Sequence, residues 1–303
     1  MILLNQIKDV TDKDKVITIG NFDGIHKGHQ ALINKTIEIA KINKLESLVL
    51  TFDMLPEEIF KKSSFRRLYN NKLKEMYLRD LGIDVFLKID FNDIRELSYV
   101  TFCEDILISK LKTKHIVIGE NFKFGKDRIG DVEKLKEYSS NFTIHSPSLI
   151  KINNENISSS KIRKLILDGN FIKAKSYLGR DYMISGSVVT GNQLGRKLNY
   201  PTANIKLEYD YPLEGVFISS TKVDNKVYPS LASIGNKPTY NGEEKLLEVY
   251  LFDFSMDIYG KNIDVVFFEK IRDQVRFTSE DDLIKQMNED YKYAIINIKK
   301  YGL

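Results

Sequence analysis

The order of the expected secondary-structure elements changes near residue 180, and this change constrains the fold more than any other feature of the sequence. Before it, short apolar runs that suit buried strands alternate with segments of helical apolar spacing. After it, strand-like runs follow one another and turn residues separate them. Alternating strands and helices favour a parallel sheet, whereas consecutive short strands favour an antiparallel sandwich or barrel. The sequence therefore predicts two different domains, 1–181 and 182–303.

The first part predicts a Rossmann-like parallel sheet with helices on both faces. Its expected strands share a short apolar core and are Lys15–Gly20, Ser47–Phe52, Asp84–Ile89, His115–Gly119 and Phe142–His145. Its expected helices share apolar residues three or four positions apart and are His29–Asn43, Lys72–Leu81, Tyr99–Leu111, Asp131–Tyr138, Ser159–Leu167 and Phe171–Leu178.

The second part predicts a small antiparallel β-barrel. Its expected strands are rich in β-branched and aromatic residues and are Tyr182–Thr190, Gly215–Val223, Val227–Ile234, Leu246–Leu251 and Ile263–Ile271. One helix, Ser279–Tyr293, is expected to close the chain.

Composition excludes several classes of protein. With 42% hydrophobic and 29% charged residues among 303, the chain has the profile of a globular protein. It has neither an apolar run long enough to span a membrane nor the apolar core of a signal peptide. The single cysteine, Cys103, excludes an intrachain disulfide. The net charge of +4 is mild and no basic stripe is interleaved with aromatics. We therefore expect a cytoplasmic protein that acts on small molecules, without a nucleic-acid or membrane partner.

A glycine–histidine loop, Gly20-Asn21-Phe22-Asp23-Gly24-Ile25-His26-Lys27-Gly28-His29, joins the first expected strand to the first expected helix. Its glycines let the backbone bend tightly and approach a phosphate, and the helix N-terminus attracts anions. His26 and His29 can donate hydrogen bonds to phosphate oxygens and stabilise charge in a transition state. A phosphate acceptor is already anionic, so nucleotidyl transfer requires positioning rather than a strong base. The loop predicts such a site; a glycine-rich turn with two surface histidines is the alternative.

Two later segments can support this site. Asn121 follows the fourth expected strand, so it belongs to the same carboxyl edge of the sheet. Ser159, Ser160 and Arg163 open a helix, where hydroxyls and a cation form an anion pocket. Ordinary helix capping and a solvated loop are the alternative interpretations.

A second candidate site follows residue 186. Glycines and cations that suit a polyphosphate are Gly191, Gly195, Arg196 and Lys197. Thr202 and Asn204 stand two apart, so on an extended segment they point to one side, and their oxygens suit Mg²⁺. Glu248 interrupts an apolar strand, where a carboxylate is costly unless it is paired or functional. Phosphorylation of a neutral alcohol needs a general base, and Glu248 is the candidate unless it simply faces solvent.

Taken in order, these motifs resemble the bifunctional riboflavin kinase/FMN adenylyltransferases, the prokaryotic FAD synthetase family. The matching segments are Gly20–His29, Gly119–Gly130, Ser158–Arg163, Gly186–Asn204, Ile234–Thr239 and Tyr259-Gly260, with Glu248. The resemblance implies that riboflavin and ATP give FMN and ADP in the barrel. It also implies that FMN and ATP give FAD and pyrophosphate in a first, nucleotidyltransferase domain, both reactions using Mg²⁺.

The resemblance also implies residue roles. ATP for adenylyl transfer would bind at Gly20, Asn21, Phe22, Asp23, Gly24, His26, His29, Asn121, Ser159, Ser160 and Arg163. ATP for the kinase would bind at Gly191, Gly195, Arg196, Lys197, Thr202 and Asn204, the last two also holding the metal. Glu248 would take the proton from the ribityl hydroxyl.

The chain departs from the family pattern after the second strand. It has Met54-Leu55 where the family has Pro-His, Ser160 where the family often has Thr, and Asn199 in place of a Gly. The first difference leaves open a riboflavin kinase with a degenerate first domain. A nucleotidyltransferase for another acceptor and a nucleotide-binding regulator without turnover are further alternatives.

Overall fold

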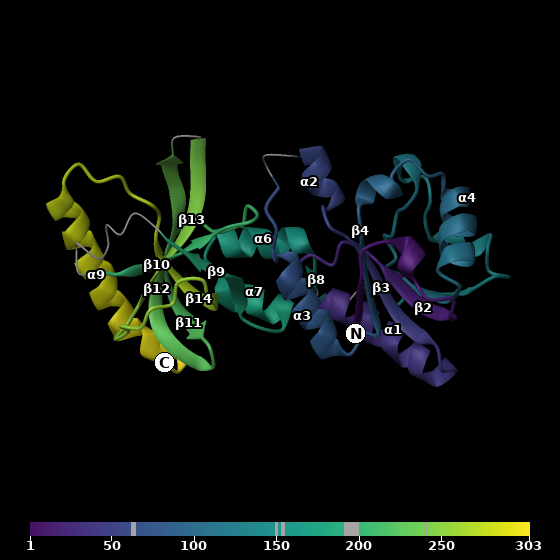
Figure 1. Cartoon of the computed structure of the whole chain (residues 1–303), viewed down its shortest axis with the longest axis horizontal. Helices are drawn as coiled ribbons and strands as arrows, with labels where there is room; N and C mark the ends of the chain where they lie inside the picture. The colour runs from purple at the N-terminus through teal and green to yellow at the C-terminus, as the bar shows by residue number, and fades with distance from the viewer. Residues whose placement is uncertain (62–64, 149–150, 153–154, 191–199, 240–241) are drawn as a thin grey trace. The chain divides into compact units, whose positions relative to one another are not determined.

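The computed structural model describes residues 1–61, 65–148, 151–152, 155–190, 200–239 and 242–303 (Figure 1). By its contacts the chain divides into two compact units. The first unit comprises Met1–Phe65 and Asn71–Ser159, and the second comprises Arg66–Asn70 and Ser160–Leu303. This division by contacts does not test the functional boundary predicted at residues 181/182, which stays a prediction.

The first unit contains a six-stranded sheet in which neighbouring strands are parallel. Its order is β1 (Ile2–Leu4), β4 (Val85–Ile89), β3 (Glu46–Phe52), β2 (Lys15–Ile19), β5 (Thr113–Val117) and β6 (Thr143–His145). β2 is buried along its whole length, as expected for a strand covered on both faces. The predicted parallel sheet is confirmed, while β1 is a strand that the sequence pattern did not predict.

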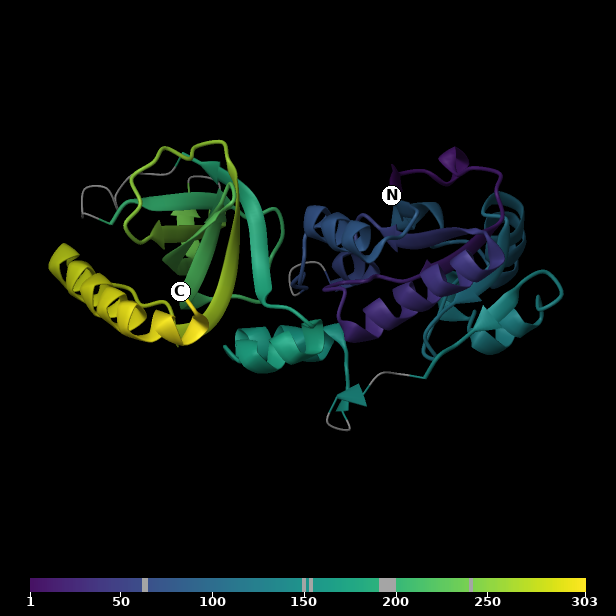
Figure 2. The same ribbon diagram turned by 90° about the horizontal axis from the view of Figure 1, so that it is seen from below.

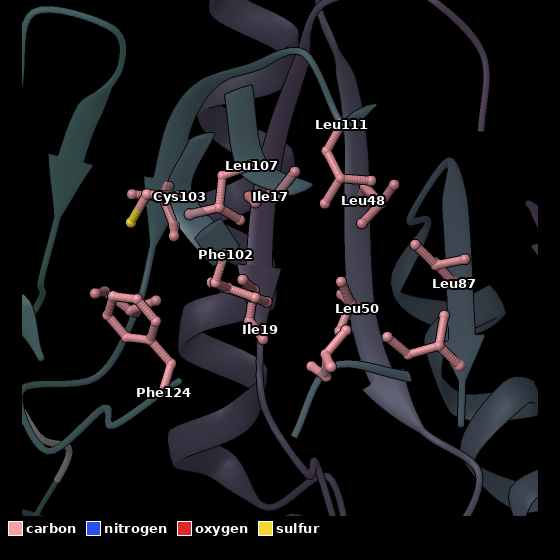
Figure 3. Packing of buried hydrophobic residues seen from close by; sticks show 14 of the residues in the cluster. Ile17, Ile19, Leu48, Leu50, Leu87, Phe102, Cys103, Leu107, Leu111 and Phe124 are labelled. Atoms are coloured by element: carbon pink, nitrogen blue, oxygen red, sulfur yellow. The ribbon is translucent and has the colours of Figure 1, made fainter. Parts of the chain in front are cut away.

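Alternate residues of the central strands pack against helices on opposite faces of this sheet. One face, with Ile17 and Leu50, packs against Phe102 and Leu107 (Figure 3). The other face, with Val49, packs against α1 (Lys27–Asn43) and α3 (Asn71–Leu81). The two-residue repeat of a strand explains this division.

Smaller elements complete the first unit. They are η1 (Ile7–Asp9), α2 (Pro56–Lys61), η3 (Phe91–Asp93), α4 (Tyr99–Thr101), η4 (Phe102–Lys110), η5 (Lys126–Arg128), α5 (Val132–Lys136), β7 (Lys151–Ile152) and β8 (Glu155–Asn156). The helix predicted over 99–111 is confirmed, although most of that segment is the π-helix η4 rather than an α-helix. Apolar spacing does not separate the two hydrogen-bonding patterns.

The second unit is built around a closed antiparallel barrel. Its strand order is β10 (Thr202–Lys206), β13 (Gly242–Leu251), β12 (Lys226–Thr239), β11 (Gly215–Val223), β14 (Asn262–Arg272) and β9 (Tyr182–Val189). The pairing of β9 with β10 closes the ring. Gly186 is required here, because a Cβ at this position would lie 2.5 Å from Cγ2 of Ile205. The predicted barrel is confirmed.

Helices pack around this barrel. α6 (Ser159–Leu167) precedes α7 (Phe171–Leu178), whose Phe171 ring contacts the rings of Phe217 and Phe267. α9 (Glu280–Ile298), yellow in Figure 2, begins at the N-cap Ser279 and ends before η6 (Lys299–Tyr301). The predicted C-terminal helix is therefore confirmed. Within the described part of the chain, no helix is long and apolar enough to cross a membrane.

Candidate functional sites

The glycine–histidine loop leaves the carboxyl end of β2 and enters α1. Its first N–H, from Gly20, donates to the carbonyl of Leu50 at 3.1 Å, which holds the start of the loop against β3. Phe22 and Ile25 have positive φ angles of 46° and 37°, and Gly24 has 82°. Positive φ is unusual for bulky residues, so the surrounding contacts must hold this backbone in place.

The two histidines of the loop lie on top of one another at the start of α1. His26 is the N-cap, and its Nδ1 accepts the N–H of His29 at 3.2 Å. The ring centroids are 3.6 Å apart and nearly parallel, and the edge of Phe22 packs on His29 at 5.3 Å. Because Nδ1 of His26 accepts, a neutral His26 carries its proton on Nε2 and can donate there. A helix N-terminus with imidazole donors can bind a phosphate.

Asn21 ties the loop to three other elements. Its amide donates to Oε2 of Glu57 in α2 at 2.7 Å. Its carbonyl accepts from Oγ1 of Thr51 at 3.2 Å and from Nζ of Lys74 at 3.0 Å. Sequence reasoning missed Thr51, Glu57 and Lys74. The available signal was Lys74 itself, which stands four residues before the apolar Leu78 and therefore on the buried face of its helix.

A cavity of about 690 Å³ in the first unit brings Asn121 to the same place as the start of the loop. Its lining includes Gly20, Asn21 and Asn121, with apolar rings such as Phe60 and Phe122. The volume and the mixture of apolar walls with a few polar groups suit a small-molecule ligand.

The serines and the arginine near residue 160 are divided between the units. Ser159 donates from Oγ to the carbonyl of Asp23 at 2.9 Å, so it supports the glycine–histidine loop. Ser160 and Arg163 belong to the second unit, where Nε of Arg163 donates to the carbonyl of Arg66 at 2.7 Å. Their predicted role in ATP binding stays a prediction.

The remaining histidines form a separate pair on neighbouring strands. Nδ1 of His115 in β5 lies 3.2 Å from Nε2 of His145 in β6, so one ring donates to the other. Burial lowers the pKa of both rings, and the nearby charges of His115 and Lys35 lower that of His145 further. These rings therefore favour the neutral form in the folded protein.

In the second unit, the register of the barrel brings the predicted base to the predicted metal ligands. Asn204 in β10 is directly opposite Glu248 in β13, and Thr202 lies two residues away on the same face. Directly opposed residues have Cβ atoms about 4.5–5.5 Å apart. Asn204 is only 7% exposed, and its amide nitrogen lies 3.5 Å from the carbonyl of Thr202, an orientation that leaves Oδ1 for a cation.

A cavity of about 460 Å³ adjoins this cluster. Thr202 lines it together with Pro201 and Ala203, and its other wall is drawn from Phe254–Tyr259. Gly191, Gly195, Arg196 and Lys197 lie outside the described residues. Across the described ranges, no three or more His, Cys, Asp or Glu side chains form a group that could hold a metal. A cation at Thr202 and Asn204 would therefore take further oxygens from a phosphate and water.

These features define a class of two-domain proteins with one candidate phosphate-binding site in a parallel α/β unit and another in a β-barrel unit. Comparison with known proteins gives the family. The family model described as FAD synthetase matches residues 8–161, and the one described as riboflavin kinase matches residues 178–297. The chain belongs to the bifunctional riboflavin kinase/FMN adenylyltransferase family, which confirms the resemblance seen in its motifs.

Named relatives support this assignment over nearly the full length. The bifunctional riboflavin kinase/FMN adenylyltransferase of Buchnera aphidicola subsp. Schizaphis graminum is 39% identical, covering 96% of this chain and 95% of the relative. That of Escherichia coli K12 is 36% identical, covering 95% and 94%. A solved structure described as a macrolide-efflux protein from Streptococcus pneumoniae is 34% identical, with a TM-score of 0.81 over 97% of this chain and 98% of that one. The high TM-score shows that the two chains share a fold.

Proposed function

We propose that this enzyme phosphorylates riboflavin to FMN in its C-terminal domain and adenylylates FMN to FAD, with release of pyrophosphate, in its N-terminal domain. The observation that carries the proposal is the pairing of Asn204 with Glu248 in the barrel, on a chain that also has a glycine–histidine loop at a strand end. Each arrangement falls within the segment matched by the corresponding family model. The functional boundary is proposed at 181/182.

In the kinase, Glu248 accepts the proton of the ribityl hydroxyl as that oxygen attacks the γ-phosphorus of ATP, and the bond to the β-phosphate oxygen breaks to release ADP. Thr202 and Asn204 would hold Mg²⁺, which neutralises phosphate charge when bound. Their hard oxygen donors fit this ion, and the near-complete burial of Asn204 holds its amide in a fixed place. The ATP phosphates are proposed to contact Gly191, Gly195, Arg196 and Lys197.

In the adenylyltransferase, a phosphate oxygen of FMN attacks the α-phosphorus of ATP, and the bond to pyrophosphate breaks. The attacking group is already an anion, so no protein base is needed. His26, His29 and the N-terminus of α1 stabilise the charge that develops on the phosphates. The other residues proposed for this ATP are Gly20, Asn21, Phe22, Asp23, Gly24, Asn121, Ser159, Ser160 and Arg163.

The departure at Met54-Leu55 motivated the alternative of a kinase with a degenerate first domain. The structure gives this segment a local role: the N–H of Leu55 donates to Oε2 of Glu58 at 2.7 Å, and the Leu55 side chain is buried at the start of α2. The match of both family models favours two activities. We also propose that the enzyme works in the cytoplasm on riboflavin, FMN and ATP alone.

Chromatography of the products from riboflavin and Mg-ATP tests the proposal. We expect FMN first and FAD later. Accumulation of FMN without FAD would establish the kinase-only alternative, and an absence of both products would favour a binding protein without turnover.

A further inference from the structure

A buried lysine lies behind the glycine–histidine loop and has no role in the reaction described above. Lys74 of α3 is only 1% exposed, and lysine is almost never buried to this extent unless its charge is satisfied. Its Nζ donates to the carbonyl of Asn21 at 3.0 Å and lies 3.5 Å from Oγ1 of Thr51. Thr51 donates to the same carbonyl at 3.2 Å. Two side chains from different elements therefore converge on one backbone oxygen of the loop.

This contact fixes the orientation of the peptide between Asn21 and Phe22. In a planar trans peptide the C=O and the N–H point in opposite directions. Because the Asn21 oxygen is held toward Lys74, the N–H of Phe22 points away from Lys74. Among the described residues, no hydrogen bond from the Phe22 N–H is found. Because the Asn21 carbonyl is held, the same peptide presents the Phe22 N–H as a hydrogen-bond donor at the start of the loop.

The same contact opposes relaxation of a strained residue. Phe22 has a φ of 46°, in the left-handed region that bulky residues avoid. Rotation of the preceding peptide would relieve this strain, and it would also move the Phe22 ring. That ring packs edge-on against His29, so a change in this peptide would shift one of the contacts that position the imidazole.

We propose that Lys74 is a positioning residue for adenylyl transfer. Its ammonium holds the Asn21 carbonyl inward, so that the Phe22 N–H and the His29 ring are presented to the ATP phosphates. Thr51 assists at the same oxygen. This inference rests on the proposed adenylyltransferase activity of the N-terminal domain.

The test is Lys74→Met, which removes the charged amino group and keeps an unbranched apolar side chain only one atom shorter. Loss of a hydrogen bond from a charged donor predicts that kcat/KM for ATP in FAD synthesis falls about 10- to 100-fold. The KM for FMN should stay within about twofold, because the contact acts on the phosphate-binding loop. FMN formation from riboflavin in the same sample should not change, since it depends on the other domain.

Lys15→Met is a matched control. Lys15 is also buried, and its Nζ donates to the carbonyl of Thr11 at 2.6 Å, but it lies at the amino end of β2, away from the loop. This variant should lower the melting temperature and leave the kinetics of FAD synthesis unchanged. Lys74→Arg should recover part of the loss seen with Lys74→Met, because it restores a cationic donor.

Each outcome bears on the inference. An unchanged kcat/KM for ATP in Lys74→Met overturns it and leaves the adenylyltransferase proposal intact. An equal rise of both KM values, or a loss that only follows the melting temperature, overturns it in favour of a structural role. Should Lys74→Met not fold, Thr51→Val replaces it and should show the same selective effect on ATP, at smaller size. If the wild-type enzyme makes no FAD from FMN, the proposed activity fails and the inference with it.

Discussion

Replacement of Glu248 by glutamine tests the kinase mechanism with the smallest change of shape. The side chain keeps its size next to Asn204 in the barrel, but it can no longer accept the proton of the ribityl hydroxyl. A positioned general base contributes about 10²- to 10⁴-fold to a rate, which is about 3–5 kcal/mol of activation free energy. We therefore expect kcat for FMN formation to fall by about that factor, with a smaller effect on the KM for riboflavin.

The assay follows both products in one sample. FMN formation is measured from riboflavin and Mg-ATP, and FAD formation is measured separately from supplied FMN, which should proceed at the wild-type rate. Glu208→Gln is the control, because Glu208 is exposed just beyond β10 and its loss removes the same charge. FMN formation by Glu248→Gln within about threefold of wild type would refute the general-base assignment.

Three further predictions follow from the structure. His29→Ala should abolish FAD formation from FMN and leave FMN formation intact, because only the first site loses a side chain that donates a hydrogen bond to the ATP phosphates. Product chromatography measures FMN and FAD. Burial lowers the pKa of His115 and His145, so below the unfolded value of about 6.5 the unfolded chain binds more protons than the folded one. Stability should therefore be full above that pH and fall as the pH decreases toward the lowered pKa values, and His145→Gln should flatten this melting profile. Asp290→Asn should destabilise the second unit by about 2–3 kcal/mol in denaturant unfolding, because Arg272, 20% exposed, loses the charge of its bidentate partner.

A different result would contradict each of these three predictions. Wild-type FAD formation by His29→Ala would remove that imidazole from the reaction. A melting profile that keeps its full pH dependence in His145→Gln would assign the protons to other groups. An unchanged unfolding midpoint in Asp290→Asn would mean that solvent or another acceptor satisfies Arg272.

The sequence predicted the architecture because the two halves have different hydrophobic periods. The apolar run in β2 and the helical spacing in α1 each identify their own element. The pattern missed β1, since three residues are too few to show a period. It also missed that Arg66–Asn70 belongs to the second unit, because this membership depends on contacts with residues far along the chain.

The candidate sites were predictable where their residues are neighbours in sequence, as in the glycine–histidine loop. The pairing of Asn204 with Glu248 was not, because the register between β10 and β13 depends on how the barrel closes. The supports of the loop were missed for another reason. Lys74 and Thr51 donate hydrogen bonds to a backbone carbonyl. Every residue has such a carbonyl, so the sequence does not indicate which one is bound.

The membership of Arg66–Asn70 has a consequence for dividing the gene. Tyr69 stacks on Tyr182 with ring centroids 5.9 Å apart, and Arg67 lies 3.9 Å above the ring of Tyr209. A kinase expressed from residue 182 onward would begin with Tyr182 uncovered and Tyr209 without its cation. A kinase unit that folds on its own would need residues 66–70 in addition to the C-terminal segment. Cutting the chain at one point therefore does not separate the two units.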